Sequence, residues 1–404
     1  MTRTESPPRA TETSRWRTSV YIIFSVTGFG LASWVSRIPS VRDALHASTL
    51  QMGFLALGIA VGSVLGFLVA GRLGPRLAPR RLITSSLILS VAGIFAVAIG
   101  SSGLGSYPVV LIGLTMLGLG NGTCNVTMNV EGAAVEHAHG RPIMSWFHAA
   151  FSIGAAIGAG LGAAAAALGV GVGVHLTVAG CLILVLTFVA SRRLRDFVPE
   201  PARTAAADGT PLRGLARIRQ SAWFERRTIL IGLTVLGVSF ANGSANDWMA
   251  LAMVDGHGVS DAAAALTVDA YVIALVTARL FGVSILARFG RVRTVQASAL
   301  LAAIGITVFI LVPSPVTAVA GAICWGLGAA LGFPVGMSAA SDDPIGASAR
   351  ISVVATVGYA GLLVGPPAVG FLAEHVGQLN ALFLILIFVI IAGLAAPVLR
   401  RPNE

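Results

Sequence analysis

Long apolar stretches, separated by short polar or arginine-containing segments, run through the chain from residue 18 to residue 399. A helix that crosses a bilayer needs about 20 predominantly apolar residues. The pattern therefore predicts twelve such helices, six on each side of one long polar segment. We place them at 18–38, 49–71, 82–101, 107–131, 143–168, 171–191, 228–253, 262–287, 293–312, 314–338, 350–373 and 378–399. The expected fold class is an all-α membrane protein.

The two sets of six predicted helices resemble each other in sequence. Residues 65–76 and residues 277–288, 212 positions further on, both read as apolar helices that end in small residues and arginine. The Gly-Leu-Gly at 118–120 recurs 208 positions further on, at 326–328. Weak internal symmetry of this kind is typical of transporters built from repeats. The predicted domains are a tail at 1–17, a six-helix bundle at 18–191, an arginine-rich linker at 192–227, a second six-helix bundle at 228–399 and a tail at 400–404.

The composition excludes a water-soluble globule. Of the 404 residues, 55% are hydrophobic and only 11% are charged, whereas a soluble domain carries about 25% charged residues. The net charge of +10 does not indicate a nucleic-acid partner, because the basic residues lie in short runs between apolar stretches. Cys124, Cys181 and Cys324 lie in apolar stretches without metal-ligand spacing. We expect no metal and no cofactor.

The arginines predict the orientation in the membrane. All 27 basic residues are arginine, and 24 of them fall on the side of the two termini. Only Arg37 and Arg42 lie on the other side, and Arg279 lies within a predicted span. Cytoplasmic loops carry an excess of Lys and Arg, so we expect a multi-pass protein of a bacterial inner membrane with both termini in the cytoplasm. Arg37 and Arg42 either attract an anionic solute or extend from a helix end toward the interface.

The loop after the second predicted span, residues 71–80, contains a motif of glycine, leucine and arginine. Its four matching positions are Gly71, Leu73, Arg76 and Arg80. Together with the six-plus-six spans and the basic linker, this loop resembles that of the major facilitator superfamily. Pro75 replaces the Asp that joins a charge latch in the family. The segments 120–131 and 140–152, with Asn246-Asp247-Trp248, are similar to a branch of fucose-permease-like and uncharacterised bacterial permeases.

Asparagine stripes are the candidate substrate-binding groups. Polar side chains in a span are costly unless they face a cavity or a partner. Asn121, Asn125 and Asn129 recur every fourth residue on the fourth span, and Asn242 and Asn246 lie on one face of the seventh. Such amides either bind a polar solute or join helices. The resemblance implies that spans one, four, seven and ten line a cavity, and we add Trp34 and Trp248, which occupy like places in the two halves.

Ionisable residues within the spans are candidates for proton coupling and gating. Asp247 and Asp269 are the acids placed well inside spans, and either a proton or a buried donor is the expected partner. His148 is either a structural histidine or a proton relay. We expect Arg279 to form an ion pair across helices and Glu131 to pair with Arg141 or Arg279. Arg76 and Arg288 mark the matching loops of the two halves and are the remaining gating candidates.

The sequence contains no ATP-binding loop, nucleophile motif or dinucleotide fingerprint, so we do not expect an enzyme. The leading hypothesis is a monomeric secondary active transporter that moves a small polar solute by alternating access, coupled to protons and surrounded by lipid. One alternative is proton-driven efflux of toxic compounds. The fourth and fifth spans lack elements of the drug antiporters, which argues against it without excluding it. A non-transporting receptor or scaffold of the same fold is the alternative of a different class.

Overall fold

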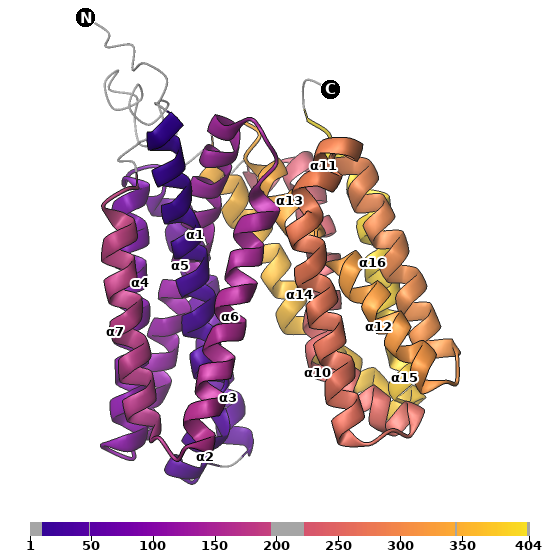
Figure 1. Cartoon of the computed structure of the whole chain (residues 1–404), viewed down its shortest axis with the longest axis horizontal. Coiled ribbons are helices and arrows are strands. Elements are labelled where there is room, and N and C mark those ends of the chain that lie inside the picture. The colour runs from indigo at the N-terminus through magenta and orange to yellow at the C-terminus, as the bar shows by residue number, and fades with distance from the viewer. Residues whose placement is uncertain (1–9, 48, 195–221, 344–345, 402–404) are drawn as a thin grey trace, which may run out of the picture. The chain divides into compact units, whose positions relative to one another are not determined.

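The computed structural model describes residues 10–47, 49–194, 222–343 and 346–401, and every regular element in these ranges is a helix (Figure 1). The helices are α1 Ala10–Val35, α2 Ile38–Leu45, α3 Thr49–Leu73, α4 Pro79–Ser102, α5 Tyr107–His139, α6 Met144–Ala167, α7 Val172–Ser191, α10 Arg226–His257, α11 Asp261–Leu311, α12 Pro315–Ala329, α13 Gly332–Ala340, α14 Ala347–Val376, α15 Gln378–Ala381, α16 Phe383–Ala395 and the 3₁₀ helix η1 Ala396–Leu399. Most of the predicted linker and parts of both tails lie outside the described residues, as do the side chains of Asn246 and Asp247.

The number of membrane spans follows from an interruption within α11. Among the described residues, eleven helices are long and apolar enough to cross a membrane. One of them, α11, has 51 residues and is interrupted at Gly290, where φ is 74° and ψ is 174°. Glycine adopts a positive φ without a steric penalty, because it has no Cβ atom. The break lies between the predicted spans 262–287 and 293–312, so α11 supplies two spans. The predicted all-α fold with twelve spans is confirmed.

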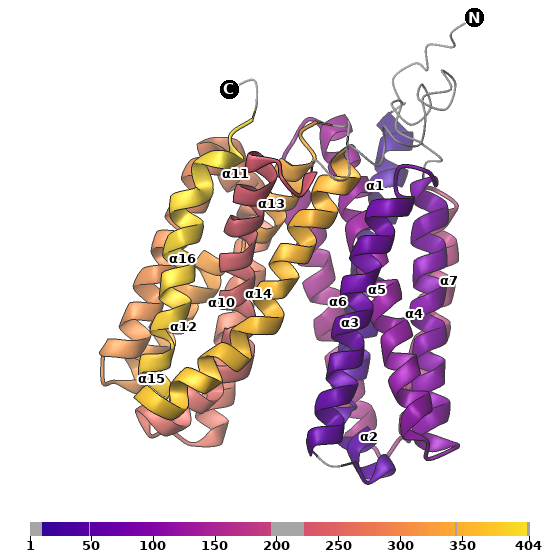
Figure 2. The ribbon, with the colours of Figure 1, turned by 180° about the vertical axis from the view of Figure 1, so that it is seen from behind.

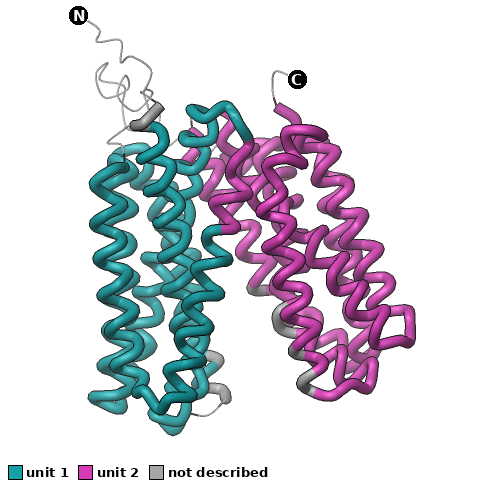
Figure 3. The backbone as a smooth tube through the Cα atoms, in the orientation of Figure 1, with its two compact units in different colours: residues 1–141, 150–208 teal, residues 142–149, 209–404 magenta. Residues whose placement is uncertain are grey.

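The chain forms two compact units, coloured separately in Figure 3. Unit 1 comprises residues 1–141 and 150–208, and unit 2 comprises residues 142–149 and 209–404. In unit 1, α5 packs against α3 and α4, and α7 packs against α1 and α4. In unit 2, α11 packs against α12, and α10 packs against α14 and α16 (Figure 2). The first part of α6 belongs to unit 2, where the indole of Trp146 donates to the carbonyl oxygen of Leu280 at 2.6 Å.

Glycines set the closest helix contacts in unit 1. A Cβ atom on Gly93 of α4 would lie 2.4 Å from the carbonyl oxygen of Gly113 of α5, and one on Gly113 would lie 2.8 Å from that of Gly93. Such distances leave no room for a methyl group, so the two backbones touch directly. Small residues that allow close backbone approach are typical of helix pairs in lipid, where dispersion contacts rather than the hydrophobic effect hold helices together.

Unit 2 repeats the same contact. A Cβ atom on Gly305 of α11 would lie 2.5 Å from the carbonyl oxygen of Gly321 of α12. Gly305 follows Gly93 by 212 residues, and Gly321 follows Gly113 by 208, which are the two shifts of the internal repeat. The contact of Gly326 with the carbonyl oxygen of Tyr271 likewise repeats the contact of Gly118 with that of Ile59. The repeat read from the sequence is therefore also a repeat of helix crossings.

Candidate functional site

Asn242 and Tyr271 join α10 to α11 inside unit 2. Tyr271 is buried, and its hydroxyl donates to the Asn242 amide oxygen at 2.5 Å. The amide nitrogen of Asn242 donates to the carbonyl oxygen of Ala329 at 3.3 Å. The Tyr271 ring also packs edge-on against Trp325 of α12, with 5.7 Å between centroids. Both ends of the predicted substrate-binding amide are therefore engaged, and its orientation is fixed by two helices.

The tenth span is interrupted in mid-course. Helix α12 ends at Ala329 and α13 begins at Gly332, and we call residues 329–333 the helix break. Pro334 has no N–H group, so the Ala330 carbonyl lacks the donor that an uninterrupted helix would supply four residues later. Arg279 of α11 fills that role, with its Nε donating to the Ala330 carbonyl oxygen at 3.3 Å. A cation at the carboxyl end of α12 is also favoured by the helix dipole.

Arg279 has a partner that was not predicted, and its expected ion pair stays a prediction. The sequence analysis expected an ion pair across helices, and the acceptor that the structure shows for Nε is a backbone carbonyl. Periodicity alone did not predict this partner, because it arises from a proline on a different helix. Pro334 is visible in the sequence and was the available signal for an interrupted span.

His148 also lies at the helix break. It is buried and belongs to the part of α6 that is included in unit 2. Its ring packs edge-on against Phe333, with 5.4 Å between centroids, and Arg279 is close enough for its charge to act on the imidazole. Asn242, Arg279 and His148 thus come from three helices and contact residues 329, 330 and 333 in turn. The sequence analysis had not connected them.

Asp269 lies on the exposed surface of α11. It follows the start of that helix at Asp261 by eight residues, or about 12 Å of helix. Tyr271, two residues further on, is buried, so the two side chains lie on different faces. Asp247, the other acid predicted to couple protons, and its neighbour Asn246 lie in α10 outside the described side chains. Trp248 is half-buried, and a Cβ atom on Gly370 would lie 2.7 Å from its ring.

In unit 1 the three asparagines of the α5 stripe differ in burial. Asn121 and Asn125 are half-buried. Asn129 is fully buried, and its amide donates to the backbone carbonyl oxygen of Asn125 at 2.7 Å. Trp34 is also buried, with 3% of its surface exposed. Of the stripe, Asn121 and Asn125 are the members with accessible surface for a solute.

The predicted gating residues differ in burial. Arg76, Arg141 and Arg288 are exposed, and Arg288 lies over the ring of Phe289, 5.3 Å from its centroid. Glu131 is buried and accepts a hydrogen bond from the indole of Trp16. Trp16 is a partner that the sequence analysis did not consider for this acid.

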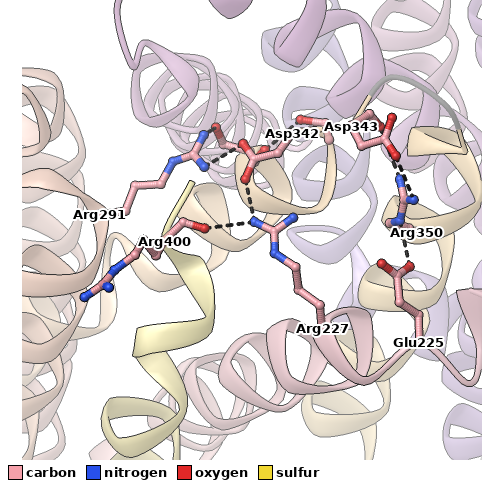
Figure 4. Close-up of polar contacts among 9 residues, drawn as sticks. Glu225, Arg227, Arg291, Asp342, Asp343, Arg350 and Arg400 are labelled. Carbon is pink, nitrogen blue, oxygen red and sulfur yellow. Dashed lines mark hydrogen bonds and ion pairs between the residues drawn. The ribbon is translucent and has the colours of Figure 1, made fainter. Parts of the chain in front are cut away.

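An ion cluster that the sequence analysis missed lies in unit 2, centred on Asp342 (Figure 4). The Asp342 carboxylate accepts from Arg227 at 2.6 Å and from Arg291 at 2.7 Å. Arg291 also donates to the Ser338 hydroxyl at 2.7 Å, and Arg227 donates to the carbonyl oxygen of Arg400 at 3.1 Å. One carboxylate therefore ties the start of α10 and the break of α11 to the end of α13.

Arg350 forms the second part of this cluster. At the start of α14, its Nε donates to Glu225 at 2.7 Å, and its Nη2 lies 3.2 Å from the Asp343 carboxylate. Glu225 directly precedes α10, so Arg350 joins the first turns of α10 and α14. The available signal was the presence of acids in otherwise arginine-rich loops.

Comparison with known proteins decides the family. The sequence profile described as Major Facilitator Superfamily matches residues 18–260 and 231–404. The chain belongs to the major facilitator superfamily. Within it, the chain is 30% identical to the uncharacterized transporter y4wD of Sinorhizobium fredii, over 96% of this chain and 98% of that protein. It is 28% identical to an uncharacterized MFS-type transporter of Yersinia pestis, over 88% of each chain.

Solved structures of the superfamily share the fold. The transporter FucP, crystallised in its outward conformation, matches with a TM-score of 0.77 at 16% identity, over 95% of this chain and 98% of FucP. At this identity the likeness concerns the fold alone. As a member of the superfamily the chain is a multi-pass membrane transporter.

Proposed function

We propose that the chain is a secondary active transporter that moves a small polar solute by alternating access, driven by protons. The arrangement at the helix break of unit 2 carries this proposal. There an amide, a guanidinium and an imidazole meet on an interrupted transmembrane helix. Interrupted helices mark substrate and ion sites in transporters, because their free backbone groups and dipole ends bind polar ligands.

The polarity of the site supports a polar solute over an apolar toxic compound. Asn242, Tyr271 and Arg279 supply hydrogen-bonding groups, and each is costly in a hydrocarbon environment unless it is paired or faces water. In unit 1, the half-buried Asn121 and Asn125 add amides on α5. A polar solute can hydrogen-bond to the accessible amides of Asn121 and Asn125, whereas an apolar drug that displaced water from them would leave them unsatisfied, at a cost of about 1–3 kcal/mol each.

Asp269 supports proton coupling. Its carboxylate is exposed on a membrane-spanning helix, and an ionised carboxylate in contact with lipid tails is strongly disfavoured. Asp269 therefore faces either water or a protein partner in the membrane. A carboxylate that meets water in one state and an apolar environment in another binds a proton in the second and releases it in the first. FucP, which shares the fold, is described as a fucose:proton symporter, and the coupling proposal rests on Asp269 itself.

The orientation remains that proposed from the arginines, with both termini in the cytoplasm of a bacterial cell. The ion cluster around Asp342 would then lie on the cytoplasmic side, where 24 of the 27 arginines fall.

The direct test is transport by purified protein in liposomes that contain a pH-sensitive dye. Sugars, polyols, amino acids and small carboxylates are added one class at a time, and ethidium serves as the apolar cation. We expect one polar class to change the internal pH and ethidium to have no effect. A response to ethidium alone would instead favour efflux of toxic compounds, and no response to any polar class would contradict the proposal.

A further inference from the structure

Arg37 is a buried cation at the arginine-poor end of unit 1. It lies between α1 and α2, and only 3% of its surface is exposed. Its Nη2 donates to the carbonyl oxygen of Val170 at 2.7 Å, and its Nη1 donates to that of Gly162 at 3.4 Å. The Arg37 side chain is therefore enclosed by protein, unlike that of the exposed Arg42. Its guanidinium is instead held against the end of α6 and the turn that follows it.

Several buried polar atoms at this end of unit 1 have no hydrogen-bond partner. They are the Nε of Arg37, the hydroxyl of Ser33 and both ring nitrogens of His175. Ser33 is fully buried and precedes Arg37 by four residues along the chain, and His175 is 9% exposed. A Cβ atom on Gly162 would lie 3.2 Å from the His175 ring, so His175 and Arg37 approach the same residue of α6. The charge of Arg37 acts on the imidazole.

The positive charge of Arg37 has no counter-charge among the described residues. Two backbone carbonyls satisfy the Nη atoms of Arg37, but no described carboxylate pairs with its charge. A buried charge is strongly disfavoured unless a counter-charge and hydrogen bonds compensate for the loss of water. The groups without partners are mainly donors, namely the Nε–H of Arg37, the Ser33 hydroxyl and at least one N–H of His175. A ligand that completes this set must carry negative charge and accept several hydrogen bonds.

We propose that Arg37, Ser33 and His175 bind a small anion at the arginine-poor end of unit 1. A monovalent ion neutralises the single guanidinium charge, and chloride requires the least room of the candidates. A short-chain carboxylate offers the same chemistry. The site lies in unit 1, shares no residue with the helix break, and can be tested without a transported solute. It therefore stands or falls independently of the proposed function.

The test is the melting temperature of the purified full-length protein at constant pH and ionic strength, with chloride or acetate replacing gluconate. Binding to the folded state raises the melting temperature in a saturable manner. We expect Arg37→Gln to weaken the apparent anion affinity at least about tenfold, because it removes a charge-assisted hydrogen bond. Arg42→Gln is the matched control, and we expect it to retain the full shift. A shift with chloride alone identifies the halide as ligand, and a shift with acetate alone identifies a carboxylate.

Two further variants keep the test decisive if Arg37→Gln does not fold. Ser33→Ala and His175→Gln leave Arg37 and its two carbonyl bonds in place, and each should shift the anion titration to higher concentration. The proposal is overturned if the wild-type melting temperature is the same in all three salts. It is equally overturned if Ser33→Ala and His175→Gln both titrate as the wild type does.

Discussion

The hydroxyl of Tyr271 lies 2.5 Å from the amide oxygen of Asn242, and this bond joins α10 to α11 within unit 2. The Asn242 nitrogen donates to the Ala329 carbonyl oxygen. The Tyr271–Asn242 bond therefore also orients the contact between α10 and the helix break. A span with predicted substrate contacts, in α10, and a span with a predicted proton-coupling residue, in α11, are thereby linked to the interrupted helix. A solute that displaces either partner would act on all three helices.

Removing the Tyr271 hydroxyl is expected to weaken unit 2. Tyr271→Phe keeps the ring against Trp325 and leaves the half-buried Asn242 oxygen without its donor, at a cost of about 1–3 kcal/mol. Thermal unfolding of the purified protein measures this loss. Tyr107→Phe is the matched control, because the Tyr107 hydroxyl bonds to the Gln51 carbonyl oxygen in an exposed setting. Equal losses of stability in the two variants would show that the Tyr271–Asn242 bond contributes no more than an exposed hydrogen bond.

The glycine crossings predict a second set of effects. Gly93→Ala would place its Cβ atom 2.4 Å from a backbone oxygen, and Gly305→Ala would place its Cβ atom 2.5 Å from one. Both distances are shorter than a van der Waals contact. Because backbone cannot move aside as a side chain does, we expect each change to destabilise the fold by about 1–3 kcal/mol. The two losses should be similar, since the positions are equivalent in the internal repeat.

Gly160→Ala is the control for this pair. Gly160 lies within α6, and a Cβ atom there would meet nothing within 4 Å. Alanine is the better helix former, so this change should be neutral or stabilise the protein by up to about 1 kcal/mol. The measurement is the thermal unfolding midpoint of each variant. A loss at Gly160 as large as that at Gly93 would contradict the packing argument.

The sequence predicted the spans well, because lipid imposes a simple rule on them. Every crossing needs a long apolar segment, and each of the 12 predicted stretches is helical over most of its length. Two of them are divided, 314–338 between α12 and α13, and 378–399 among α15, α16 and η1. The Gly-Leu-Gly repeat likewise marked true helix crossings at Gly118 and Gly326. These features depend on residues close together in the chain, or on identical residues at a fixed shift.

The partners of polar side chains were much harder to predict. Arg279 bonds to a carbonyl that Pro334 leaves free on another helix, and Arg37 turns inward to the end of α6. Neither helical periodicity nor charge counting says which distant backbone groups lack a donor. The same holds for Asp342, whose two arginines are 115 and 51 residues away. Such contacts arise from tertiary packing, which one sequence does not show.

The ion cluster yields a prediction with an internal control. Asp342 has only 9% of its side chain exposed and pairs with two arginines. Asp342→Asn would leave both cations without their carboxylate, so we expect a loss of about 3 kcal/mol in the free energy of unfolding. Asp343, the next residue, has 50% of its side chain exposed. Asp343→Asn should cost about 0–1 kcal/mol, and comparable losses at the two positions would show that burial does not decide the strength of this cluster.

Proton coupling through Asp269 gives the last prediction. Asp269→Asn preserves the shape of the side chain but can neither bind nor release a proton. If this carboxylate links proton movement to solute movement, the variant should fail to accumulate solute against its gradient in liposomes. It should still exchange labelled for unlabelled solute at equal pH, because exchange needs no net proton transfer. Asp255→Asn, at an exposed position near the end of α10, should behave as the wild type. Accumulation by the Asp269 variant at the wild-type level would place the proton path elsewhere, with His148 at the helix break the next residue to test. Accumulation by the wild type that a protonophore leaves unchanged would show that protons do not drive transport at all.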